Sequence, residues 1–102
     1  MEVKWTKFAF NSLKSIFKYY KENVNELIAN NIKDEILSVT KQLEHFHLSG
    51  KKEDLLKELM LDHRFIVKGN YKVIYRIEKD IVYITDVFDT RQNPNKILTR
   101  NK

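Results

Sequence analysis

The sequence of 102 residues contains no cysteine, one proline and only two glycines. Without cysteine, the chain has no disulfide framework and no cysteine nucleophile. It also lacks an apolar run long enough for a signal peptide, and no window approaches the roughly 20 apolar residues that cross a membrane. We therefore expect a soluble, cytoplasmic protein without a membrane partner.

Positive charge is in modest excess, and the chain is short. The 19 lysines and arginines outnumber the 14 aspartates and glutamates, which gives a formal charge of +5. Such an excess hints at a polyanionic partner, although it is common in proteins that bind none. A chain of this length forms one domain with a small core, so we expect a single domain over residues 1–102.

The stretch from His63 to Pro94 has the pattern of an antiparallel β-meander. Alternating apolar runs occupy residues 65–67, 71–77 and 81–88, and short turn segments separate them. β-Branched and aromatic residues at period two, interrupted by Gly, Asn and Asp, are typical of strands joined by tight turns. A two-residue turn at Lys79-Asp80 then defines one core face, which contains Tyr71, Val73, Tyr75, Ile77, Val82, Ile84, Asp86 and Phe88.

The first turn of the meander allows two registers, because one residue of slip reverses every side chain of the first strand. A two-residue Gly69-Asn70 turn would place Arg64 on the core face. A three-residue loop from Lys68 to Asn70 would instead bury Phe65 and Val67. Since burying unpaired cations is costly, we expect the three-residue loop.

The first half of the chain predicts two helices that cover the sheet. Residues 2–5 have the pattern of a brief strand, and Thr6 offers an N-cap for a helix from Lys7 to Tyr20. Asn23 with Glu26 resembles a capping box for a second helix that ends near His45. The short connection makes an antiparallel hairpin. The predicted fold class is α+β, with a short N-terminal strand and a helical hairpin packed on a small antiparallel sheet.

Two segments have weaker patterns. Residues 53–60 are compatible with one or two helical turns or with a packed loop. The tail, residues 95–102, is polar and basic apart from Ile97 and Leu98, and we expect it to fray.

The order of several residues matches a known family. Arg64 opens the first strand of the meander, Gly69 lies in the turn, and the next strand reads Tyr71-Lys72-Val73-Ile74-Tyr75. The last strand ends in Val87-Phe88, and a short loop leads to Arg91. From Trp5 to about Pro94 the chain resembles the RelE/ParE superfamily of toxins from bacterial type II toxin–antitoxin modules. The resemblance implies the fold predicted above and a cognate antitoxin as partner, with no small-molecule cofactor and no metal.

The superfamily contains two mechanisms. RelE-like members are ribosome-dependent mRNA endonucleases, and ParE-like members poison DNA gyrase. The residues that the resemblance would assign to RNA cleavage are Arg64, Lys72 and Arg91 for charge stabilisation and His63, Asp86 and Asp89 for proton transfer. The tyrosine that RelE itself carries after the last strand falls near Lys96 or Ile97, and neither can replace it. We therefore favour the ParE-like mechanism, in which the protein need not be an enzyme.

Two further sets of residues are candidates for partner contacts. Those assigned to the target, DNA gyrase or the ribosome with its mRNA, are Arg76, Asp89 and Gln92. Those assigned to a folding-on-binding antitoxin segment, on the outer face of the sheet, are Ile66, Ile74, Tyr83 and Val87.

Purely structural roles are the alternatives for these residues. The basic side chains could cover the sheet with their aliphatic stems. Arg91 could instead hold its loop through Asp89 or Asp86, and His63 could be a rim residue. A non-toxic binding module on the same scaffold is therefore a third hypothesis.

Overall fold

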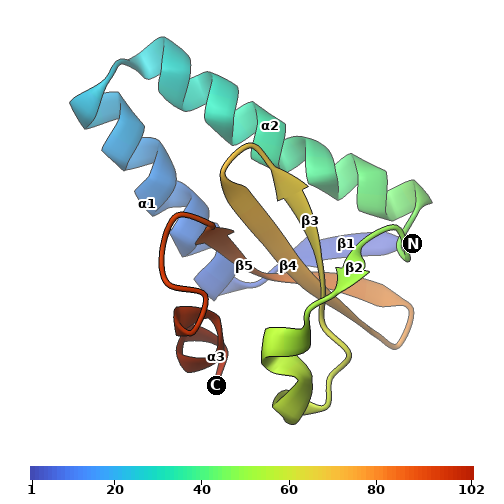
Figure 1. The fold of residues 1–102 in the computed structure, drawn as a ribbon. Coiled ribbons are helices and arrows are strands. Elements are labelled where there is room, and N and C mark those ends of the chain that lie inside the picture. Colours follow the sequence, from blue (N-terminus) through green and yellow to red (C-terminus); the bar gives the residue numbers. More distant parts are fainter.

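The computed structural model describes all 102 residues and shows a five-stranded sheet with helices on both faces (Figure 1). The sheet order is β1-β5-β4-β3-β2, and β1 runs parallel to β5, so the sheet is mixed. The elements are β1 (Glu2–Trp5), α1 (Lys7–Asn23), α2 (Glu26–His45), β2 (Lys51–Lys52), the 3-10 helix η1 (Asp54–Leu59), β3 (Arg64–Lys68), β4 (Tyr71–Glu78), β5 (Ile81–Asp89) and α3 (Lys96–Asn101). The predicted α+β class is confirmed. None of the helices is long and apolar enough to cross a membrane.

The helical hairpin forms as predicted except for one cap. Thr6 caps α1, and its hydroxyl accepts a hydrogen bond from the Ala9 amide at 3.1 Å. The cap of α2 is Asn25, whose side chain accepts from the Ile28 amide at 2.8 Å, rather than Asn23. Asn23 ends α1 instead, and its side-chain amide donates to the Tyr19 carbonyl. The predicted capping box is therefore wrong, although α2 itself is present and ends at His45 as expected.

The register of β3 corrects the predicted first turn. Lys68 pairs with Tyr71 and Arg64 with Tyr75, so the connection is the two-residue Gly69-Asn70 turn. Gly69 has a φ of 56°, which suits the first central residue of a type II′ hairpin turn. Arg64 therefore lies on the face that the helical hairpin covers, with Tyr75. Its charge is tolerated there because Nη1 donates to the Gly50 carbonyl at 2.9 Å and faces the Leu48 carbonyl at 3.4 Å.

A β-bulge in β5 reverses a second set of predicted side chains. Tyr75 pairs with Ile84 but Ile74 pairs with Asp86, which leaves Thr85 as the extra residue. Beyond Thr85, Val87 points to the helical hairpin, whereas Asp86 and Phe88 point to the opposite face. The predictions that Asp86 and Phe88 lie on the core face, and Val87 on the outer one, are wrong.

Both faces of the sheet are buried, each in its own apolar core. The hairpin packs on a core that includes Leu13, Ile36, Leu43, Val73, Tyr75 and Ile84. On the other face η1 and α3 cover a smaller core of Leu56, Ile74, Phe88 and Ile97, against which Phe65 and Leu98 pack. Figure 1 shows these two layers on opposite sides of the sheet. The prediction that residues 95–102 fray is wrong, because this segment contains α3, whose Ile97 is only 1% exposed.

Tyr75 holds the loop that follows α2 in place. Its hydroxyl accepts a hydrogen bond from the Gly50 amide and donates to the His47 carbonyl, both at 2.9 Å. A side chain at position 50 would place its Cβ 2.6 Å from the Tyr75 hydroxyl oxygen, so this position requires glycine. The packing sets the path from the hairpin into β2.

Candidate functional site

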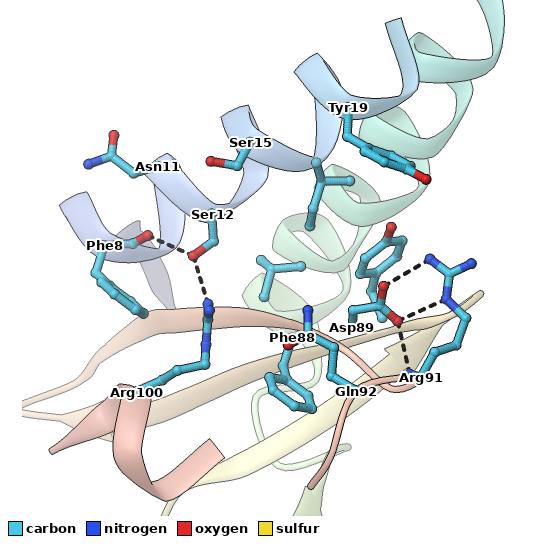
Figure 2. A pocket seen from close by; sticks show the side chains of 13 residues that line it. Phe8, Asn11, Ser12, Ser15, Tyr19, Phe88, Asp89, Arg91, Gln92 and Arg100 are labelled. Carbon is cyan, nitrogen blue, oxygen red and sulfur yellow. Dashed lines mark hydrogen bonds and ion pairs between the residues drawn. The ribbon is translucent and has the colours of Figure 1, made fainter. Parts of the chain in front are cut away.

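A groove of about 560 Å³ lies between α1 and the end of β5. Figure 2 shows its side chains, with Arg100 near the start of α1 and Arg91 at the other end. The lining residues are Phe8, Asn11, Ser12, Ser15, Ile16 and Tyr19 of α1, Tyr71, Val87, Phe88 and Asp89 of β4 and β5, and Arg91, Gln92 and Arg100 beyond them. Two of the predicted target-binding residues, Asp89 and Gln92, are therefore in this groove.

Arg91 closes the loop after β5 through a bidentate ion pair. Its Nη2 lies 2.8 Å from Asp89 Oδ2 and its Nε lies 3.0 Å from Oδ1, while Nη2 also donates to the Tyr20 hydroxyl at 3.2 Å. The hydrogen bond from Arg91 holds the pKa of Asp89 below its usual value, and the carboxylate raises the pKa of Arg91. The structural alternative predicted for Arg91, a tie to Asp89, is confirmed.

Arg100 neutralises a carboxylate that lies inside the protein. Asp86 is fully buried, and Arg100 donates to it through Nη2 at 2.7 Å and through Nε at 3.1 Å. Asn101 donates to the same carboxylate at 3.1 Å, and Ser12 adds a long contact at 3.4 Å. This hydrogen bonding raises the pKa of Arg100. Asp86 therefore anchors α3 and is not a free proton-transfer group.

Arg100 and Asn101 were missed because the tail was expected to fray. A signal was nevertheless present, since a lone aspartate inside an apolar strand requires a cation or donors elsewhere in the chain. Ile97 and Leu98 also supply the apolar pair that a docking helix needs.

Lys72 forms a second buried ion pair, on the face of the sheet that α3 and η1 cover. Its Nζ lies 2.8 Å from Glu53 Oε2 and 4.1 Å from the centroid of the Phe65 ring. Glu53 is only 4% exposed, so Lys72 is the group that makes its burial tolerable. This pairing accounts for Lys72 without a bound phosphate.

His63 lies nearby, in the turn that leads into β3, and is 6% exposed. Its Nδ1 is buried without a hydrogen-bond partner. Burial lowers the pKa of His63, and the charge of Arg76 lowers it further. Arg76 itself pairs with Glu78 at 2.5 Å and lies over the Tyr83 ring, 5.3 Å from its centroid.

The structure does not bring the predicted catalytic residues together. Arg64 lies beside β2 on the face that the helical hairpin covers, and Lys72 lies on the face that α3 and η1 cover. Arg91 follows the end of β5. Each of the three donates to a group of the protein itself.

The predicted antitoxin-binding face is also covered. Ile74 is fully buried beneath α3 and η1. Val87 is 2% exposed and lies on the other face, beneath the helical hairpin. Ile66 is partly exposed but packs against the core of the hairpin, on that same face, so Tyr83 is the one partly exposed member of the set that is not packed against that core.

The fold belongs to a class of structure that is already known. A helical hairpin on one face of a small mixed sheet is the arrangement found in a solved structure titled "Chromosomal ParDE TA system from P. aeruginosa". The TM-score is 0.72 and the sequence identity 19%, over 87% of this chain and 95% of that one. A comparison with curated protein sequences gave no significant match.

The sequence identifies the family within that class. Residues 3–94 match the model of the ParE toxin of the type II toxin–antitoxin system parDE, so the chain belongs to this family. The family recognised from the strand and turn residues is thereby confirmed. α3 lies beyond the matched segment.

Proposed function

We propose that this protein is a growth-arresting toxin that acts by binding DNA gyrase and is neutralised by a cognate antitoxin. Membership of the ParE family supports the toxin role. The proposal for the mechanism adds that inhibition arises from binding and requires no catalytic step.

We favour gyrase binding over RNA cleavage because the basic residues lie apart from one another in the structure. Attack by an RNA 2′-hydroxyl needs a base, a stabiliser for the phosphorane and an acid around a single phosphate. Arg64, Lys72 and Arg91 lie in three separate places and are engaged by Gly50, Glu53 and Asp89. Binding a large target requires no such convergence.

The groove at the end of β5 is the surface proposed to contact the target. Arg91 retains 55% exposure of its side chain even in its pair with Asp89, and Gln92 beside it is exposed. Tyr19 adds an exposed aromatic ring to the rim. Exposed aromatic and arginine side chains around a hollow are the residues that most often dominate protein interfaces.

The test is expression of the toxin in bacteria, followed by analysis of chromosomes and of mRNA. The test variants are Arg64→Lys and Arg91→Lys, separately and together, with Lys41→Arg on the exposed surface of α2 as the control. A bidentate phosphate contact tolerates Arg→Lys poorly, whereas a charged binding surface tolerates it well.

We expect growth arrest with broken chromosomes and at most a few-fold effect of either substitution. Loss of toxicity in folded Arg→Lys variants, together with cut mRNA in cells that express the unaltered protein, would instead identify a ribosome-dependent endonuclease. Full growth without either lesion would identify a non-toxic binding module.

A further inference from the structure

Four lysines of α1 lie along a single stripe of the helix. They follow one another at intervals of seven, four and three residues, and all four are exposed: Lys7, Lys14, Lys18 and Lys21. These intervals place side chains on one face of a helix. From the first to the last the stripe is roughly 21 Å long at 1.5 Å per residue. We call these four residues the lysine track.

The charges of the lysine track are not neutralised within the protein. None of the four side chains takes part in any of its ion pairs. Lys33 of α2 lies beside the track, in a groove that three of its members also line, and Glu22 is the only carboxylate in that groove. Together with Lys33, the track carries as much positive charge as the formal net charge of the whole chain, +5. This concentration of charge is available to a partner.

The fold presents the lysine track on an open surface. The opposite side of α1 is packed, with Ala9 and Leu13 buried in the core beneath the hairpin. Figure 1 shows that the tip of the hairpin, where α1 ends at Asn23, projects beyond the sheet. The track therefore faces outward along a straight, rigid helix whose position the core fixes.

A straight row of exposed lysines is complementary to the backbone of a nucleic acid duplex. Duplex DNA carries one negative charge per roughly 1.7 Å of its axis, so a track of this length faces about a dozen phosphates. Lysine is a flexible point charge and contacts phosphates without reading bases. The track therefore suits binding that depends on charge and not on DNA sequence.

Single strands and membranes fit this surface less well. A single-stranded nucleic acid is held by free aromatic rings on which its bases stack. The rings beside the track already have cations over them, with Lys14 Nζ 5.7 Å from the Phe10 centroid and Lys33 Nζ 5.3 Å from that of Phe17. A helix that binds a membrane surface inserts its apolar face into the lipid, and the apolar face of α1 is occupied by the core.

We propose that the lysine track binds the phosphate backbone of duplex DNA, without sequence preference. The inference goes beyond the proposed function and does not depend on it, since binding to gyrase is assigned to the groove at the end of β5. DNA lies along the outer side of α1, and each lysine of the track contacts one phosphate. Lys33 adds charge at the edge of the contact.

The test is fluorescence anisotropy of a labelled 20-base-pair duplex, titrated with the purified protein at several salt concentrations. The test variant is Lys14→Gln/Lys18→Gln. The matched control is Lys51→Gln/Lys79→Gln, at exposed positions in β2 and in the turn before β5 that form no ion pair. Both double variants lower the formal charge by two, from +5 to +3. Circular dichroism and thermal melting check that each variant is folded.

We expect the affinity of the unaltered protein to fall roughly a hundredfold between 50 and 200 mM salt, because four phosphate contacts give a slope of about −3.6 in a plot of log K against log salt. The test variant should have about half that slope and a dissociation constant raised at least tenfold at 50 mM salt. The control should keep the slope and stay within threefold of the unaltered protein. Lys14→Arg/Lys18→Arg, which retains the charge, should bind as the unaltered protein does.

Three outcomes would overturn the proposal. Equal weakening in the test variant and the control would show that net charge alone attracts the DNA. Tighter binding to a single strand of the same length would assign the surface to unpaired bases. Binding to vesicles with 30% phosphatidylserine, without binding to the duplex, would assign it to a membrane. Each of these results would leave the proposed binding of gyrase intact, because inhibition of supercoiling is measured separately.

Discussion

Replacing Arg100 by glutamine tests whether a buried ion pair holds α3 to the sheet. The substitution leaves the carboxylate of Asp86, which is 0% exposed, with only Asn101 at 3.1 Å and Ser12 at 3.4 Å. Removing one partner of a buried ion pair costs about 3–5 kcal/mol. The Arg100 side chain is 33% exposed and partly hydrated, so we expect the lower limit, about 3 kcal/mol.

Urea unfolding, followed by circular dichroism, measures this loss. Asp86→Asn should be milder, about 1–2 kcal/mol, because the freed guanidinium can reach water. The double variant should be less destabilised than the sum of the two single variants by at least about 1 kcal/mol. Lys102→Gln is the control, since its pair with Glu58 is exposed and 4.0 Å long, and the free energy of unfolding should not change. A loss below about 1 kcal/mol for Arg100→Gln would refute the reasoning.

Two further predictions concern local packing and pH. Gly50→Ala should destabilise the protein by about 2–3 kcal/mol, because the new Cβ meets Tyr75 and the Phe65 carbonyl. The Cβ of Gly69→Ala makes only an ordinary contact, 3.7 Å from Glu35 Oε2, and this substitution should cost about 1 kcal/mol through its positive φ. Equal losses in urea unfolding would contradict this difference. Because burial lowers the pKa of His63, the unfolded chain takes up its proton at a higher pH than the folded protein. The free energy of unfolding should therefore fall as the pH drops below about 6.5. His63→Gln should flatten that decline and His45→Gln should not; an unchanged slope in His63→Gln would show that another group is responsible.

Local sequence signals were sufficient for most of the elements. Thr6 at a helix start and Lys79-Asp80 between two apolar runs determine their structures with little help from distant residues. Both turn residues at 79 and 80 have positive φ, as a type I′ hairpin turn requires. The helices and long strands were therefore predictable to within a few residues.

The face assignments failed where distant partners decide them. Arg64 lies on the face that the helical hairpin covers because the carbonyl acceptors of Leu48 and Gly50 approach it from the chain that enters β2, and no local pattern around Arg64 indicates them. The bulge at Thr85 has no glycine or proline to indicate it, yet it reverses the faces of every later residue of β5. That reversal provides the apolar surface on which α3 folds, so the tail could not be placed without it.

The candidate site was predictable only as a set of residues. Asp89, Arg91 and Gln92 were recognised and do lie together. Their mutual pairing, and the pairing of Lys72 with Glu53, depend on side-chain positions that no sequence spacing specifies. Arg100 was not recognised, because its role requires the folded tail.

Titration of the purified toxin into a supercoiling reaction of purified DNA gyrase tests the central claim most directly. The proposed function predicts loss of supercoiling at a toxin concentration close to that of gyrase, and recovery when the antitoxin is added. Under the same conditions, translating ribosomes should retain intact mRNA. Unimpaired gyrase together with mRNA cut on the ribosome would contradict a toxin that acts by binding gyrase.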